Sequence, residues 1–296
     1  MRHAIRTLAL TALSLTVAAV SAFAAPQVVS SVNGIGLIDY YGKPDFKVGD
    51  WASYRMIGSS ELGMSDDYTV TVMIAGEEEW WGEPCFWVET WTEMQNQAPL
   101  TKCALMSYAV FQDTMPVQRM QMYQRKTISG LGENGLPQQE VSRAAASALK
   151  SRTLFTRPLQ WEVDTVGVDT VNTPKGVFDT KIITIKQGTG ATASVGDSSI
   201  YTEVRENRTS YHSLKIPITH IVKEDIESII ARRTWMIGRS GEGTPLNIRD
   251  RGLGSARLID YGHGKQARLL PVELRRTIAE QKAAKAKAKA GAASKR

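Results

Sequence analysis

Long uninterrupted apolar runs are absent from this chain. The apolar stretch at residues 8–20 is broken by threonine and serine, so it falls short of the roughly 18 to 20 apolar residues that a membrane span needs. Arg2 and Arg6 precede it and Ala22-Phe23-Ala24 follows it, which is the pattern of a secretory signal peptide with its cleavage site. No cysteine stands at that site to take a lipid. We therefore expect a leader over residues 1–24 and a soluble, periplasmic product.

The body of the chain has no net positive charge, although the whole sequence carries a net +6. Residues 271–296 hold eight cations and two acids, and the leader holds two arginines, so residues 25–270 carry −2. A nearly neutral body gives no reason to expect nucleic-acid binding. We expect a signal peptide (1–24), a single domain (25–270) and a basic Lys/Ala-rich tail (271–296) that is disordered or transiently helical.

Cysteine is limited to Cys85 and Cys103, which export would bring into an oxidising compartment. They lie on neighbouring predicted strands, and a hairpin centred near Gln97 would place Cys103 opposite Thr92. Cys85 would then lie about 23 Å away at roughly 3.3 Å per residue, whereas a disulfide requires Cα atoms within roughly 7 Å. A bridge would need a bulge, a bend or a different pairing, so a disulfide and two buried thiols remain alternatives.

Most of the body alternates apolar and polar residues with a period of two, as half-buried antiparallel strands do. Strands are expected at residues 68–74, 85–94, 101–112, 117–128, 161–166, 176–186, 199–205, 209–214, 232–239 and 256–261. Residues 226–230 fit either strand or helix. The acidic run Glu77, Glu78 and Glu79 is expected to end the strand before it and to form a solvated turn.

Helical spacing is nearly absent, with the exception of residues 137–152, where alanine and leucine recur among good helix formers. A long run of strands broken once by a helix predicts a mainly β (α+β) fold. We expect a strongly curved antiparallel sheet or incomplete β-barrel, with one or a few helices on its concave side.

Three segments in order carry a family resemblance: Phe46–Tyr54 opens the first long strand, Thr173–Phe178 is a turn followed by a strand, and Ile216–Lys223 follows a strand that ends at His212. This pattern resembles the Lol carrier and receptor superfamily of periplasmic lipoprotein carriers, and the uncharacterised outer-membrane-associated proteins grouped around it. The resemblance covers most of residues 45–262. It implies a half-barrel whose concave apolar face holds acyl chains beneath helices. This chain departs from the best-studied carriers in its length, its tail and its single expected helix.

Residues 130–135, Gly-Leu-Gly-Glu-Asn-Gly, match the letters of a dinucleotide-binding fingerprint but lack its context. That fingerprint needs a glycine-rich turn that opens directly into a helix of a parallel βαβ unit. Here Pro137 intervenes and the neighbouring strands are expected to be antiparallel. We expect a loop at this place and no cofactor.

No catalytic or metal-binding set can be nominated from the sequence. His212 and His220 are eight positions apart with Pro217 between them, which fits no metal-ligand spacing, and His263 is remote from both. Ser240 lacks the glycine two places on that a nucleophile elbow requires. We expect a protein that is not an enzyme and holds no metal.

Tryptophan is concentrated at Trp80, Trp81, Trp87 and Trp91. On a strand, Trp87 and Trp91 share a face with Glu89. One set of aromatics would line the concave side of the sheet, with Trp80 and Trp81 at its rim. The group is compatible with an apolar pocket, with a membrane-facing lip, or with an ordinary core.

These observations lead to two functional hypotheses. The first is a carrier or binding protein that holds an apolar ligand, such as an acyl chain, near the outer membrane. In addition, the basic tail would give it a weak attraction to an anionic lipid surface. The second is a non-catalytic envelope scaffold that uses its sheet edges and its basic tail to contact a membrane-protein partner or an anionic polymer. An open apolar concavity would favour the first, and a solid core with an exposed apolar patch would favour the second.

Overall fold

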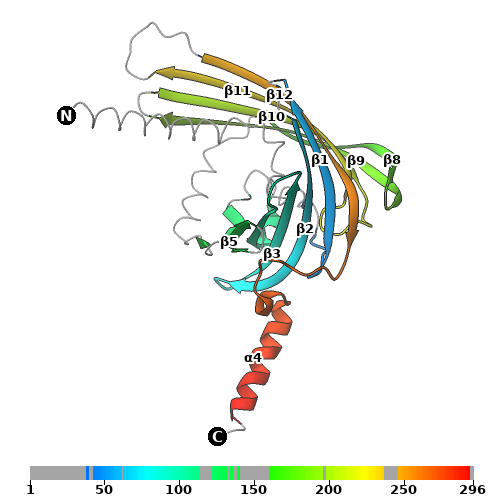
Figure 1. Ribbon diagram of the computed structural model, residues 1–296, viewed down its shortest axis with the longest axis vertical. Coiled ribbons are helices and arrows are strands. Elements are labelled where there is room, and N and C mark those ends of the chain that lie inside the picture. The colour runs from blue at the N-terminus through cyan, green and yellow to red at the C-terminus, as the bar shows by residue number, and fades with distance from the viewer. Residues whose placement is uncertain are drawn as a thin grey trace, which may run out of the picture.

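A computed structural model describes residues 38–39, 43–61, 63, 65–113, 120, 122–131, 134–135, 139–140, 160–195, 198–236 and 246–293. These residues form a single antiparallel β-sheet that is strongly curved (Figure 1). Its long strands are β1 (Trp51–Ser60), β2 (Ser65–Trp80), β3 (Glu83–Met94), β4 (Leu100–Ser107), β5 (Gln124–Leu131), β8 (Gln160–Thr173), β9 (Gly176–Val195), β10 (Ser198–His212), β11 (Ile221–Met236) and β12 (Leu246–Gly262). Two short strands, β6 (Asn134–Gly135) and β7 (Gln139–Glu140), lie beside β5.

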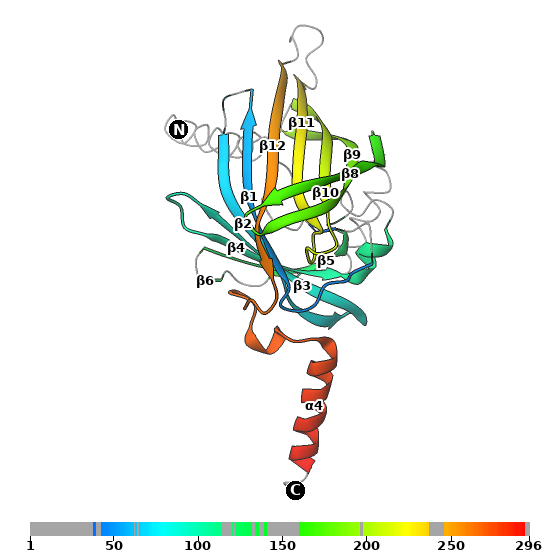
Figure 2. The ribbon, with the colours of Figure 1, turned by 90° about the vertical axis from the view of Figure 1, so that its right-hand side faces the viewer.

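The strand order along the sheet is β6-β5-β4-β3-β2-β1-β12-β11-β10-β9-β8. The first and last strands therefore meet at its centre, where Trp51 lies opposite Gly262. Strand β8 and the β5 side remain as two separate edges within the described residues, so the sheet does not close into a barrel (Figure 2). The expected fold class, a curved antiparallel sheet with few helices, is confirmed.

Several strands are longer than the sequence pattern indicates. The acidic run Glu77–Glu79 lies inside β2 rather than in a turn, because β2 continues after a bulge between Ile74 and Gly76 and pairs with β3 as far as Trp80. Residues 199–205 and 209–212 belong to one strand, β10, whose polar middle pairs with both neighbours. Residues 226–230 lie in β11.

Other segments differ in type from the sequence-based expectation. Residues 108–112 form a 3₁₀ helix, η3 (Tyr108–Gln112), instead of continuing β4, and the Ser107 hydroxyl caps it by accepting the N–H of Ala109. The expected strand at 117–128 is helical at residues 120 and 122–123, and β5 begins only at Gln124. Within the expected helix at 137–152, Gln139–Glu140 pair with β5 as strand β7, and the other members lie outside the described residues. The expected leader, residues 1–24, lies outside them as well.

Both faces of the sheet are buried in most of β3 and β4 and in the middle of β2, whereas in β1 the face that carries Arg55 and Ile57 is exposed. One face, here called the Tyr54 face, packs side chains of these strands against Ile216 and Ile218 from the loop before β11. The opposite face, here called the Trp87 face, has its own apolar cluster. That cluster contains Met73, Ala75, Cys85, Trp87, Trp91, Cys103, Leu105, Ile128, Ala267 and Leu270.

Ala267 and Leu270 belong to a segment that we call the C-terminal strap, residues 263–277. It leaves β12, packs on the Trp87 face, and includes the 3₁₀ helix η4 (Val272–Leu274). Helix α4 (Ile278–Ala293) follows it and projects away from the sheet in both ribbon views (Figure 1 and Figure 2). The residues expected to form a separate tail therefore begin inside a packed segment and continue as a helix.

Candidate functional site

Trp87 and Trp91 are core residues beneath the strap. Their side chains are 0% and 2% exposed, and both lie on the face that also carries Glu89, as the strand pattern predicts. The Trp87 Nε1 donates to Glu78 at 3.1 Å, and the Trp91 Nε1 donates to Glu89 at 2.7 Å. Each indole is thus buried with its N–H satisfied, which is the ordinary-core alternative rather than the lining of an open pocket.

Glu89 fixes the strap to the sheet. Its side chain is fully buried, and one carboxylate oxygen accepts the backbone N–H of Arg268 at 2.5 Å in addition to the Trp91 indole. The other oxygen accepts the N–H groups of Leu269 and Leu270 at 3.0 and 3.1 Å. Three consecutive amides therefore converge on one carboxylate, an arrangement that backbone N–H groups use to hold anions.

Trp80 and Trp81 lie at the turn between β2 and β3, as expected for residues at a rim. Lys126 Nζ lies 3.4 Å from the Trp80 ring centroid, and the Arg125 guanidinium lies 5.1 Å from that of Trp81. Both cations come from β5 and are also paired with carboxylates of β2 and β3. Cations of the same chain therefore contact both indole rings.

Cys85 and Cys103 are buried and unbridged. Cys103 lies opposite Glu89 rather than Thr92, because the β3–β4 turn is centred earlier in the chain than expected. Cys85 lies four positions along β3 from that pair, about 13 Å at roughly 3.3 Å per residue. Burial raises the pKa of the Cys85 thiol to about 11, and burial together with the nearby charge of Glu89 raises the pKa of Cys103.

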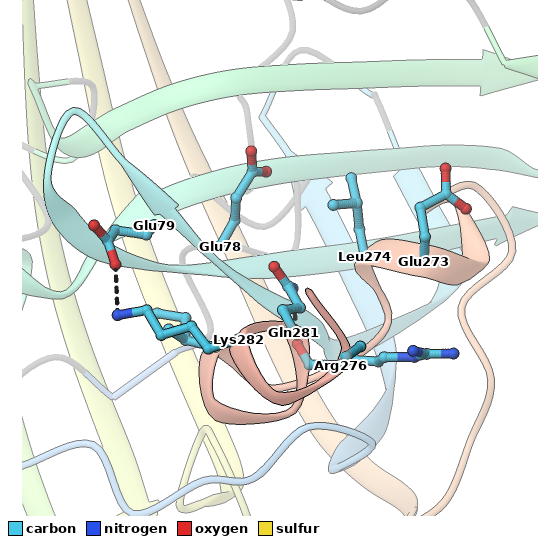
Figure 3. A pocket seen from close by; sticks show the side chains of 9 residues that line it. Glu78, Glu79, Glu273, Leu274, Arg276, Gln281 and Lys282 are labelled. Carbon is cyan, nitrogen blue, oxygen red and sulfur yellow. Dashed lines mark hydrogen bonds and ion pairs between the residues drawn. The ribbon is translucent and has the colours of Figure 1, made fainter. Parts of the chain in front are cut away.

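A groove of about 630 Å³ lies where the strap passes into α4 (Figure 3). It separates the end of β2 from the first turns of the helix, and an ion pair of 2.9 Å between Lys282 and Glu79 crosses it. The residues that line it are Glu78, Glu79, Glu273, Leu274, Arg276, Ile278, Gln281, Lys282 and Ala284. Five of these nine residues are charged, so the lining offers no predominantly apolar set of side chains for an acyl chain.

Glu77 attaches the first turn of α4 to β2. Its backbone N–H donates to the Arg276 carbonyl at 2.9 Å, and its carboxylate accepts the N–H of Ile278 at 3.0 Å. Its carbonyl also accepts the Gln281 side-chain amide. A capping box completes the turn, because Thr277 and Glu280 each accept the backbone N–H of the other. The helix is thus fixed at one end.

Beyond that turn, α4 is cationic and has no apolar face. Lysine occupies positions 282, 285, 287 and 289, and no acid follows Glu280. Helices that lie in a membrane interface usually carry a wide apolar stripe, which alternating lysine and alanine cannot supply. Among the described residues, no helix combines the length and the apolar character needed to cross a membrane.

The Tyr54 face becomes polar toward β9, β10 and β11. Glu224 lies opposite Ala256, which lies opposite Met56, so its side chain is on the same face as Met56. Glu224 accepts the Ser210 hydroxyl at 2.6 Å, and Arg208 pairs with Glu206 at 3.1 Å, all four side chains being buried. In the described residues, this face therefore does not form a continuous apolar lining.

The sequence pattern missed a cluster of histidine and aspartate. His220 lies between Asp39 and Asp45, with a ring nitrogen 2.9 Å from each carboxylate, and His212 lies 3.6 Å from Asp39. Partners about 180 positions apart leave no local pattern by which they could be found. Within the described part of the chain, no group of three or more His, Cys, Asp or Glu residues is arranged to hold a metal ion.

The comparisons with known proteins assign neither a family nor a function to this chain. No family model matches the chain, and no curated protein matches it. Among solved structures, a LolA superfamily protein from Nitrosomonas europaea matches at 8% identity with a TM-score of 0.22, over 78% of this chain and 93% of that one. A TM-score of this size establishes neither a common fold nor a common ligand.

Proposed function

We propose that this protein is a non-enzymatic binding protein of the periplasm, which attaches to an anionic surface through α4. The attachment of α4 supports the proposal: its first turn is held by Glu77 on β2, while the lysine-bearing turns project away from the sheet (Figure 1). Because its first turn is fixed, the helix axis has a defined direction relative to the sheet.

The expected contact is electrostatic. A lysine near an anionic lipid surface contributes about 1 kcal/mol, and the attraction falls off over about 10 Å at 0.1 M salt. Lys282 is paired with Glu79 at 2.9 Å, so we count only Lys285, Lys287 and Lys289, which would together supply about 3 kcal/mol for weak, reversible binding. Because α4 has no apolar stripe, we expect it to contact head groups without entering the acyl region.

Sedimentation with phosphatidylcholine vesicles, with and without phosphatidylglycerol, tests the proposal. We expect binding only to the anionic vesicles, weakening as salt is raised. Replacing Lys285, Lys287 and Lys289 by alanine should weaken it by about a hundredfold, at about 1 kcal/mol per lysine.

A matched control removes the same net charge from the body, by alanine at Lys43, Lys181 and Lys215. We expect this variant to bind nearly as well as the unmodified protein. Equal weakening of both variants would show that only net charge matters, and binding of neither vesicle type by the unmodified protein would contradict the proposal. Binding to a soluble polyanion but not to vesicles would exclude the membrane as the surface.

A second candidate is the carriage of an apolar ligand, such as an acyl chain or a lipoprotein lipid, on the Tyr54 face. The observation that favours it is an aromatic cluster covered by a separate chain segment: Phe46 packs on Phe86, Tyr108 and Phe111. Mass spectrometry of lipids extracted from the protein purified from its native host tests this candidate. A bound acyl lipid in stoichiometric amount would support it, and a lipid-free protein would contradict it.

A further inference from the structure

Every described histidine contacts an aspartate of one chain segment. This N-terminal segment comprises residues 38–39 and 43–50 and lies before β1. His220 contacts Asp39 and Asp45 at 2.9 Å each, and His212 lies 3.6 Å from Asp39. His263, just after β12, contacts Asp50 at 2.8 Å. Histidines from three places in the chain thus hold one segment.

The two contacts of His220 require its charged form. Both ring nitrogens face carboxylate oxygens, which accept hydrogen bonds and do not donate them when ionised. A neutral imidazole has one N–H, so it can satisfy one of these aspartates while its other nitrogen faces the second carboxylate without a proton. The ring is only 7% exposed, so water does little to compensate for the lost contact.

The groups around His220 affect the protonation of its imidazole. Its pKa is raised from the ordinary 6.5, first by the hydrogen bond to Asp39, against the effect of burial, and then by Asp45. Four elements that pack around His220 carry titratable or charged groups. The N-terminal segment carries Asp39 and Asp45, and β10 carries His212, with Lys181 of β9 opposite it. Strand β1 carries Tyr54, which contacts Thr219 next to His220.

The N-terminal segment covers apolar side chains of the Tyr54 face. The Phe46 ring lies 5.1 Å from Phe86, 6.0 Å from Tyr108 and 5.9 Å from Phe111, centroid to centroid. Ile38 is buried in the same core. Backbone hydrogen bonds fix the ends of the segment, from the Asp39 N–H to Ile218 and from the Gly49 N–H to Ile74. Loss of the His220 contacts would leave the Asp39 end held by its backbone hydrogen bond alone, and would free the part between the two ends.

We propose that the histidine–aspartate pairs form a pH-sensitive clamp, which holds the N-terminal segment over the Phe86, Tyr108 and Phe111 cluster and loosens as the His220 imidazolium loses its proton. The sign follows from the direction of the shift. A histidine whose pKa is raised on folding contributes its full stabilisation below the ordinary value of 6.5 and loses it as pH rises through the raised value. The proposed clamp does not depend on either of the two functions proposed above.

Hydrogen exchange of the purified protein tests this proposal. Protection factors, which correct for the intrinsic pH dependence of exchange, are compared between pH 6 and pH 9 for the Asp39 and Gly49 amides and for amides of β10 and β11. We expect protection of the Asp39 amide to fall with rising pH by about tenfold for each unit by which the His220 pKa is raised. Protection in β10 and β11 should remain constant, and an NMR titration of the His220 ring should give the same midpoint.

Variants separate the clamp from general stability. His220→Gln should give low protection of the Asp39 amide at every pH, because glutamine does not titrate. His263→Gln is the matched control, and it should keep the pH dependence at Asp39 because both contacts of His220 remain. Should His220→Gln fail to fold, Asp45→Asn serves instead: the Asp45 side chain is 52% exposed, and its change should move the transition to lower pH.

Three results would overturn the clamp. The first is an unchanged pH dependence at Asp39 in His220→Gln. The second is a His220 ring that titrates at or below 6.5 in the intact protein. The third is an Asp45→Asn variant whose transition stays at the same pH.

Discussion

The carboxylate of Glu89 is expected to be one of the most sensitive single positions in this protein. It accepts four hydrogen bonds, two on each oxygen, from the Trp91 indole and from the backbone of residues 268–270. Glu89→Gln keeps the size of the side chain but replaces one oxygen by an NH₂ group. Two buried donors then face a donor instead of an acceptor.

The cost can be worked from those contacts. Leaving a buried donor unsatisfied costs about 1–3 kcal/mol, so two donors should lower the free energy of unfolding by about 2–6 kcal/mol. A domain of ordinary stability has about 5–15 kcal/mol in total. We therefore expect either a large fall in global stability or detachment of the strap from the Trp87 face.

Glu93→Gln is the matched control. Glu93 lies on the same strand and contacts the Arg268 side chain at 3.3 Å, but its side chain is 53% exposed. An exposed pair of this kind contributes about 0–1 kcal/mol. Urea unfolding followed by circular dichroism gives the two free energies, and hydrogen exchange at residues 268–270 reports the strap directly.

The reasoning would be refuted if Glu89→Gln cost no more than Glu93→Gln and the amides of residues 268–270 kept their protection. Loss of protection at those amides with little change in global stability would instead show that the strap opens alone. That result would agree with the role given to Glu89.

Two further predictions concern the same face. Gly76→Ala should destabilise the protein by about 1–3 kcal/mol in urea unfolding, because an added Cβ collides with the Leu274 carbonyl oxygen. Gly167→Ala should cost little, because its added Cβ would only reach ordinary contact distance from Ile182. Similar costs for the two variants would contradict the close approach of the strap. Cys85 and Cys103 should resist iodoacetamide at pH 8 in the native protein and react in urea, because burial raises the pKa of both thiols. Mass spectrometry measures the labelling, and rapid labelling of the native protein would show that the Trp87 face is open.

Local pattern predicted the sheet because alternation acts over neighbouring residues. Trp87, Glu89 and Trp91 share a face whatever packs on it, and that grouping followed from period two alone. The same pattern could not place strand ends. The Glu77–Glu79 run reads as a turn, yet it extends β2 because partners from β5, η3 and α4 contact its side chains.

Composition and periodicity were enough to predict the antiparallel β class, the position of Trp87 and Trp91 on one side of a strand, and the separation of a nearly neutral body from a basic C-terminus. What covers each face of the sheet depends on contacts between segments far apart in the chain. Glu89 meets amides about 180 positions later, and His220 meets Asp39 across a similar interval. Such contacts form because the fold brings distant segments together, and no short-range periodicity encodes them.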